Sequence, residues 1–290
     1  VLVLPAGSVR AQDAAPAYPV YVVQEGDNLW SIALRFGISQ DALAEANNLT
    51  DLNNLKVGDR LIIPGLEGIT GVLETKPIQY GDSLRALSLR HQVSESLLAR
   101  LNRVSSPQEL VAGWNLILLQ SDQTVALGGR AWLEPGQSLF GAAAAQGVNH
   151  WTALLANQLA GSWQALPGEV LVLPGEVGEA PSALPSEVSQ LSFSVPAVQG
   201  GTSVLKLNGS EGLLLGGSFL DHPLNFHSSM PGEFIALQGV HALTEPGLYP
   251  LEITLAQPEG VAFTFAQNVL VEDAGYPYDP ILYVEAATID

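Results

Sequence analysis

The chain has 290 residues, enough for about two domains of ordinary size, and it contains no cysteine. Eleven Lys and Arg residues against 29 Asp and Glu residues give a formal net charge of −18, while 47% of the residues are hydrophobic and 14% are charged. This composition excludes a disordered acidic chain, disulfides, cysteine-ligated zinc and a thiol nucleophile. It also argues against nucleic acid or an anionic membrane surface as the partner, because both require clustered cations.

Residues 1–19 begin with the apolar stretch Val1–Ser8, and the first residue is not Met. We interpret this segment as the remnant of a signal peptide followed by a linker, with a frayed apolar terminus as the alternative. No run of 18 apolar residues occurs elsewhere, so we expect no membrane span. An exported chain without disulfides fits a bacterial cell envelope.

Three tandem copies of one small unit follow, related by a period of 55 residues. Gly26-Asp27-Asn28-Leu29 returns as Gly81-Asp82-Ser83-Leu84 and again as Gly136-Gln137-Ser138-Leu139. The same spacing relates three further sets of positions: Asn47, Asn102 and Asn157; Gly58, Gly113 and Gly168; and Leu61, Leu116 and Leu171. Four anchors in one register indicate repeated domains.

The first copy, residues 20–65, predicts the order strand, helix, helix, strand. A β-rich run at 21–23 precedes an amphipathic helix whose apolar side chains recur at helical spacing, namely Leu29, Ile32, Ala33 and Phe36. We expect Asp27 to be its N-cap and Gly37 to follow its C-terminus. Ser39 is expected to cap a second helix, and a polar loop at 47–56 leads to a second strand at 61–63.

These residues resemble the LysM module. The resemblance rests on four segments: Tyr21-x-Val23, Gly26-Asp27-x-Leu29-x-x-Ile32-Ala33, Leu43-x-x-x-Asn47 and Leu55-x-x-Gly58-x-x-Leu61-x-Ile63-Pro64. LysM modules are βααβ units that bind N-acetylglucosamine-containing glycans, chiefly peptidoglycan and chitin. The resemblance therefore implies such a glycan as the partner, held by the loop after the first strand and the loop before the second.

In this sequence those loops contain ten candidate glycan-binding residues: Gly26, Asp27, Asn28, Leu29, Trp30, Thr50, Leu52, Asn53, Asn54 and Leu55. Backbone N–H and C=O groups on tight loops suit the acetamido group of the sugar, and Leu29, Leu52 or Leu55 can cover its methyl. Asn28, Thr50 and Asn53 are the candidate side-chain ligands.

Several of these positions also have a structural interpretation. Asp27 is expected to cap a helix rather than touch ligand, and Leu29 to be a core residue first. Asn47 and its two counterparts are expected to satisfy backbone groups of the following loop. Trp30 lies off the helical stripe, so it is either a sugar-stacking platform or a contact to the next module. The other tryptophans, Trp114, Trp132, Trp151 and Trp163, are expected to be packing residues.

The second copy, residues 73–120, and the third, residues 128–175, are degenerate. In the second, Lys76-Pro77-Ile78 replaces the strand motif and Leu119 stands where Pro64 stood. The third keeps Leu173-Pro174-Gly175 but has Gln137 in place of the acid. Whether either copy binds sugar is left open.

After a Pro- and Ala-rich linker at 176–189, the spacing of apolar residues changes from the helical period to strict alternation. Alternating apolar runs, among them 249–255 and 261–265, predict an immunoglobulin-like β-sandwich over 190–273. Residues 234–240 and 246–251 resemble the small β-domain that precedes the catalytic domain in some lysostaphin-like zinc endopeptidases. Residues 274–290 are expected to connect to a possible downstream domain.

Catalysis within this chain is not expected. None of the five histidines has Asp four residues later, and no two are separated by one residue, so the zinc-ligand pattern of that endopeptidase family is absent. His222 and His227, five apart, are poorly spaced for one metal ion. No nucleophile-elbow sequence supports a Ser/His/Asp triad, and the alternating β pattern leaves little room for a glycosidase cleft. We expect no cofactor and no metal.

The sequence thus predicts an α+β chain, with three tandem βααβ LysM modules followed by an all-β sandwich. The expected function is non-catalytic peptidoglycan binding by a secreted bacterial cell-wall protein, as the targeting region of a zinc metalloendopeptidase. The alternative is a structural or adhesion protein in which LysM modules tether a protein-binding β-sandwich.

Overall fold

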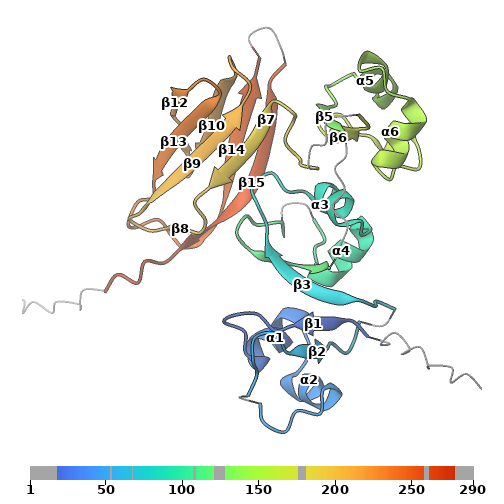
Figure 1. The fold of residues 1–290 in the computed structure, drawn as a ribbon. Coiled ribbons are helices and arrows are strands. Elements are labelled where there is room, and N and C mark those ends of the chain that lie inside the picture. The colour runs from blue at the N-terminus through green and yellow to red at the C-terminus, as the bar shows by residue number, and fades with distance from the viewer. Residues whose placement is uncertain are drawn as a thin grey trace, which may run out of the picture. The chain divides into compact units, whose positions relative to one another are not determined.

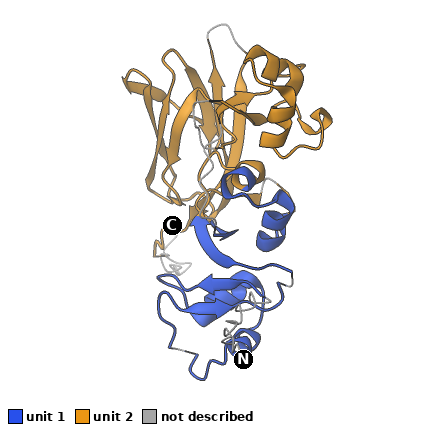
Figure 2. Cartoon of the chain, turned by 45° about the vertical axis from the view of Figure 1, so that its right-hand side comes forward, with its two compact units in different colours: residues 1–76, 88–104, 115–125 blue, residues 77–87, 105–114, 126–290 orange. Residues whose placement is uncertain are grey.

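The computed structural model describes residues 18–52, 54–66, 68–106, 109–120, 128–175, 181–257 and 261–277. These residues form two compact units (Figure 2). Unit 1 comprises residues 1–76, 88–104 and 115–125, and unit 2 comprises residues 77–87, 105–114 and 126–290. The expected signal-peptide remnant and most of the expected C-terminal connector lie outside the described residues.

The first copy folds as predicted, in the order β1 (Val20–Val22), α1 (Leu29–Phe36), α2 (Gln40–Ala46) and β2 (Arg60–Ile62) (Figure 1). The four apolar residues expected on the inner face of α1 are all buried, which confirms its amphipathic register. Gly37 ends α1 at φ 63°, a left-handed conformation that costs glycine little, and Ser39 caps α2 by accepting from Ala42 N–H. These local signals were sufficient to place both helices.

Unit 1 also contains a four-stranded sheet in the order β2-β1-β3-β4, with β3 at Val72–Pro77 and β4 at Asn115–Leu119. β1 pairs antiparallel with β2 and parallel with β3. The expectation that Lys76-Pro77-Ile78 replaces the first strand of the second copy is wrong, because that strand lies earlier, at 72–77. Two helices follow it, α3 (Leu84–His91) and α4 (Glu95–Asn102).

The repeated asparagine joins the second helix of each copy to its second strand. Asn47 donates from Nδ2 to the carbonyls of Leu43 and Ile62, and its Oδ1 accepts from Ile62 N–H, at 2.7–2.8 Å. Asn102 and Asn157 make the same three bonds in their own copies. These residues therefore satisfy backbone groups, as predicted, but the groups belong to the helix end and the strand rather than to the loop.

Unit 2 contains the third copy, which folds in the same order as the first. Its elements are β5 (Gly129–Trp132), α5 (Leu139–Ala145), α6 (His150–Ala156), a 3₁₀ turn (Ser162–Gln164) and β6 (Val170–Leu173). β5 and β6 pair antiparallel. The buried side chains of these elements form a core of their own.

Unit 2 also contains a β-domain of two sheets that share one hydrophobic core. One sheet has the order β11-β10-β14-β15-β8 and the other the order β12-β13-β9-β7. The strands are β7 (Val188–Phe193), β8 (Ala197–Val198), β9 (Thr202–Gly209), β10 (Leu214–Phe219), β11 (His222–Pro223), β12 (Phe226–Met230), β13 (Glu233–Gly239), β14 (Gly247–Ala256) and β15 (Phe263–Glu272). β7 begins inside the stretch expected to be a linker, and Leu184 of that stretch is buried in the β-domain core.

Candidate glycan-binding loops of the first copy

The first of the two loops predicted to hold glycan begins next to the point of the sheet at which the second loop ends. Val23 N–H donates to Asp59 C=O at 2.9 Å, and Gly58 N–H donates to Val23 C=O at 2.8 Å. Leu29, at the end of the first loop, is buried in the same hydrophobic cluster against which Leu55 of the second loop packs. Backbone pairing and a shared core therefore hold both loops on one scaffold.

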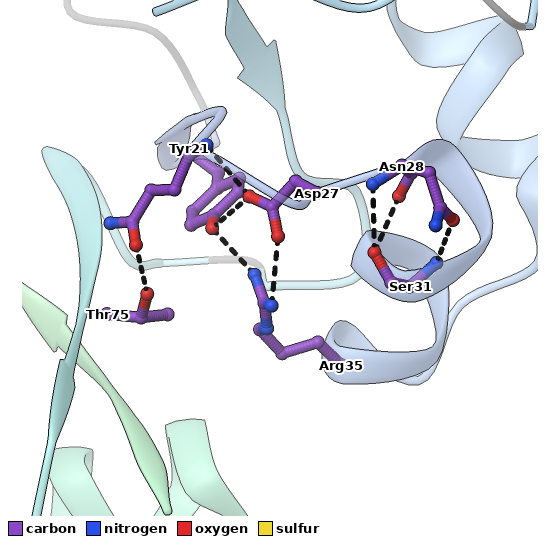
Figure 3. Close-up of polar contacts among 7 residues, drawn as sticks. Tyr21, Asp27, Asn28, Ser31, Arg35 and Thr75 are labelled. Atoms are coloured by element: carbon purple, nitrogen blue, oxygen red, sulfur yellow. Dashed lines mark hydrogen bonds and ion pairs between the residues drawn. The ribbon is translucent and has the colours of Figure 1, made fainter. Parts of the chain in front are cut away.

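A buried polar cluster fixes the first loop (Figure 3). The carboxylate of Asp27 accepts from the Tyr21 hydroxyl at 2.6 Å and from Gln24 N–H at 2.8 Å. Arg35 of α1 pairs with the same carboxylate at 2.9 Å and donates to the Tyr21 hydroxyl at 2.6 Å. The Asp27 side chain is only 4% exposed. Asp27 thus has a structural role, and its partner Arg35 was recognisable from the sequence only as a basic residue in the last turn of the helix.

The prediction that Asp27 is the N-cap of α1 is wrong. The cap is Asn28, whose Oδ1 accepts from Ser31 N–H at 2.8 Å, while Ser31 Oγ accepts from Asn28 N–H at 3.0 Å. This reciprocal pair occupies the Asn28 side-chain oxygen that we expected to bind sugar. Asp27 cannot serve as the cap because its carboxylate faces Tyr21 and Arg35.

The remaining candidates divide by exposure. Leu29 is 2% exposed, so its burial contradicts a contact between its side chain and the sugar, whereas Trp30 is 60% exposed. In the second loop Leu55 is half-buried and three residues are exposed, namely Thr50, Leu52 and Asn54. Gly26 is exposed at φ 83°. Asn53 lies outside the described residues.

The carboxylate at position 27 has equivalents in both other copies. Asp82 accepts from Gln79 N–H at 2.8 Å, and Gln137 accepts from Glu134 N–H at 3.2 Å. An amide oxygen therefore closes the same turn when the acid is absent, which shows that the turn needs an acceptor rather than a charge.

Burial, followed by the hydrogen bond to Asp27, raises the pKa of Tyr21 from 10.0 to about 12. Because the folded state favours the neutral phenol, this contribution to stability is complete below about pH 10 and is lost as the pH rises from 10 towards 12. Urea denaturation followed at several pH values across this window should show a steeper loss of stability in the wild-type chain than in Tyr21→Phe. Equal pH dependence in the two proteins would contradict the assignment. Burial also raises the pKa of Tyr80, so Tyr21→Phe removes only part of the alkaline dependence.

The expectation that the later tryptophans are packing residues is right only for Trp132. Its ring meets Phe263 of the β-domain edge-on, with centroids 5.3 Å apart. Trp114, Trp151 and Trp163 are 46%, 71% and 75% exposed. The sequence around each tryptophan did not distinguish a packed ring from an exposed one, because tryptophan is compatible with either environment.

Within the described ranges, no group of three or more His, Asp or Glu side chains is arranged to hold a metal ion. No helix in that part of the chain is long and apolar enough to cross a membrane.

Comparison with protein families supports the interpretation of the first two copies. The LysM domain family matches residues 21–64 and 78–118. Over 126 residues the chain is 32% identical to a "Probable N-acetylmuramidase" of Lactococcus lactis subsp. cremoris, an alignment that covers 36% of this chain and 28% of the relative. Over 51 residues it is 39% identical to the LysM domain receptor-like kinase 3 of Arabidopsis thaliana, covering 18% of this chain and 8% of that one.

Among solved structures, the chain is similar to the spore cortex-lytic enzyme SleL of Bacillus megaterium QM B1551. The sequence identity is 27%, the match covers 41% of this chain and 25% of that one, and the TM-score is 0.28. The chain spans less than a third of the length of each of these curated relatives. Two stretches of this chain thus match the LysM domain family, and the curated relatives include a probable N-acetylmuramidase.

Proposed function

We propose that the first copy binds the N-acetylglucosamine units of a cell-wall glycan across residues 26–30 and 50–55. The observation that carries this proposal is that the LysM family matches the whole of this copy and that both loops remain open. An ideal Cβ atom built at Gly26 or Gly58 meets nothing within 4 Å. A sugar can therefore approach the backbone of both turns.

The chemistry of these loops suits a neutral ligand. With Asp27 and Asn28 engaged in internal bonds, the loops offer backbone amides and carbonyls, the side chains of Thr50 and Asn54, and the apolar surfaces of Trp30 and Leu52. Each neutral hydrogen bond contributes about 0.5–1.5 kcal/mol, so one copy binds weakly. A net charge of −18 does not oppose an uncharged sugar.

The third copy is a second glycan site within this proposal. An added Cβ at Gly136 or Gly168, the counterparts of Gly26 and Gly58, also meets nothing within 4 Å. Phe140 stands at the position of Trp30 and is 65% exposed. Two sites on one chain bind a long glycan more tightly than either alone, because the second binding event is intramolecular.

The parent protein is proposed to be a secreted peptidoglycan hydrolase that this segment holds on the bacterial cell wall. Two of the curated relatives bear the name "Probable N-acetylmuramidase", which favours cleavage of the glycan strand over the zinc endopeptidase expected from the β-domain resemblance. Within this proposal the chain itself supplies binding and the β-domain of residues 190–273 is a non-catalytic sandwich of immunoglobulin-like type.

A second candidate function, protein binding by the third copy rather than by the β-sandwich, is favoured by one observation. Phe140 of α5 and Trp151 and Leu155 of α6 expose 65%, 71% and 77% of their surfaces. Exposed apolar side chains gathered on two adjacent helices are typical of an interaction surface. Binding of the chain to a protein but to neither chitin oligomers nor insoluble peptidoglycan would favour this alternative and contradict the glycan proposal.

Replacing Trp30 by alanine should weaken binding of N-acetylglucosamine oligomers about twofold to tenfold, because an aromatic platform adds about 0.5–1.5 kcal/mol beyond its area. Isothermal titration calorimetry with chitin oligomers measures the affinity. Leu34→Ala is the matched control, since Leu34 is 62% exposed on the next turn of α1. Equal affinities for wild type and Trp30→Ala would refute the stacking role.

A further inference from the structure

The second copy differs from the other two in the surroundings of its loops. Its residues 77–87 and 105–114 belong to unit 2, together with the β-domain. These segments correspond, 55 residues earlier and 55 residues later in the chain, to the open loops of the first and third copies. The β-domain therefore contacts the same loops that are proposed to hold glycan elsewhere.

Glycines at equivalent positions show the difference most directly. A Cβ added at Gly81 would lie 2.6 Å from Leu184 Cδ1, and one added at Gly113 would lie 2.9 Å from Val195 Cγ2. The same atom meets nothing within 4 Å at four counterpart glycines, Gly26, Gly58, Gly136 and Gly168. Among these six described glycines, those of the second copy alone are covered by other side chains.

Hydrogen bonds hold these loops against the β-domain. Tyr80 is 6% exposed, and its hydroxyl lies 2.8 Å from the Leu251 carbonyl of β14 and 3.1 Å from the Phe265 carbonyl of β15. Ala112 N–H donates to the Asn268 carbonyl at 2.9 Å. Each loop is thus bonded directly to the β14–β15 pair.

Gln267 of β15 lies between the two loops and is 6% exposed. Its Oε1 accepts from Gly81 N–H at 2.9 Å, and its Nε2 donates to the Leu110 carbonyl at 3.2 Å. Gly81 belongs to the turn after the first strand of the copy and Leu110 to the loop before the second. One carboxamide therefore joins the two loops by accepting from one and donating to the other.

The acetamido group of N-acetylglucosamine has the same pair of functions as a carboxamide, a carbonyl acceptor beside an N–H donor. We propose that Gln267 occupies the place of a sugar acetamido group in the second copy, so that the β-domain acts as a built-in ligand and closes this site. The proposal rests on the function proposed for the first copy, whose corresponding groups are Gly26 N–H and Leu55 C=O. Glycan binding is then confined to the first and third copies, and the second copy serves to hold the β-domain.

The test uses the full chain labelled with ¹⁵N and an N-acetylglucosamine pentamer as the probe. Saturating pentamer should shift the amide resonance of Gly26 and leave that of Gly81 unchanged. A shift at Gly81 comparable with that at Gly26 would overturn the closed site. If the amide resonances of Gly26, Gly81 and Gly136 all remain unchanged, the proposed function is contradicted. The variant Gln267→Leu then tests the contact of Gln267 with the two loops independently of glycan binding.

Gln267→Leu keeps the side-chain size but removes both hydrogen bonds. Amide hydrogen exchange at Gly81 should accelerate at least about tenfold, whereas the Gly81 resonance should still not respond to the pentamer, because Leu184 and Val195 continue to cover the two turns. Ala266→Leu, at the neighbouring exposed position of β15, should change neither property. Unchanged exchange at Gly81 in Gln267→Leu would refute the ligand-like role. If Gln267→Leu fails to fold, Gln267→Asn, which is too short to reach both loops, provides the same two readouts.

Discussion

Replacing Asp27 by alanine is expected to destabilise the first copy by about 3 kcal/mol. The substitution leaves the Tyr21 hydroxyl, the Gln24 amide and the Arg35 guanidinium without the buried carboxylate that they share. Removing one partner of a buried ion pair costs about 3–5 kcal/mol, and we take the lower end because the Arg35 side chain is 24% exposed. The first loop should lose its fixed shape.

Native-state hydrogen exchange of amides in α1 measures this effect, since the chain has several domains and does not unfold as one unit. A loss of about 3 kcal/mol corresponds to an acceleration on the order of 100-fold. Glu25→Ala is the matched control, because Glu25 is an exposed acid in the same loop. Similar exchange rates in Asp27→Ala and Glu25→Ala would show that the polar cluster does not stabilise the loop. Affinity for chitin oligomers should fall only in Asp27→Ala.

Arg130→Met is expected to destabilise the junction between the third copy and the β-domain by about 3 kcal/mol. Arg130 is 8% exposed and donates from Nη1 to the Leu184 carbonyl at 2.8 Å and from Nη2 to the Val188 carbonyl at 2.7 Å. Methionine retains most of the apolar stem, so the change isolates the guanidinium. Each buried carbonyl that loses its donor costs about 1–3 kcal/mol.

Limited proteolysis at residues 181–188, together with hydrogen exchange of the Val188 amide, reports the loss. Both should increase in Arg130→Met and stay unchanged in Arg100→Met, because Arg100 is exposed on α4. If cleavage remains as slow as in wild type, the two hydrogen bonds do not hold this segment in place.

The three copies carry different residues at the position of Trp30, and the difference follows the surroundings of their loops. Position 30 of the first copy and position 140 of the third carry exposed aromatic side chains, Trp30 and Phe140, whereas the second copy carries Arg85 at this position. Arg85 lies 3.6 Å from Glu169 of the third copy, an ion pair inside unit 2. A position that carries an exposed aromatic residue in the open copies thus takes part in an internal contact where the loops are covered.

The sequence by itself determined the repeat, the order of elements in the first copy and the caps at Gly37 and Ser39. These features depend on residues within a few positions of one another, where periodicity and capping preferences act directly. The prediction of Asp27 as the cap of α1 was wrong because Asn28, the next residue, is an equally competent cap. The choice follows from Tyr21 and Arg35, which the fold brings to Asp27 from β1 and α1.

Only the tertiary structure decided which copies have open loops. Gln267 is 186 residues from Gly81 along the chain, and Tyr80 is 171 residues from Leu251. No periodicity or local propensity encodes contacts at such separations, because they form only when the β-domain packs against the loops of the second copy. The sequence identified three versions of one βααβ unit, and the packing of β14 and β15 against the second version distinguishes it from the other two.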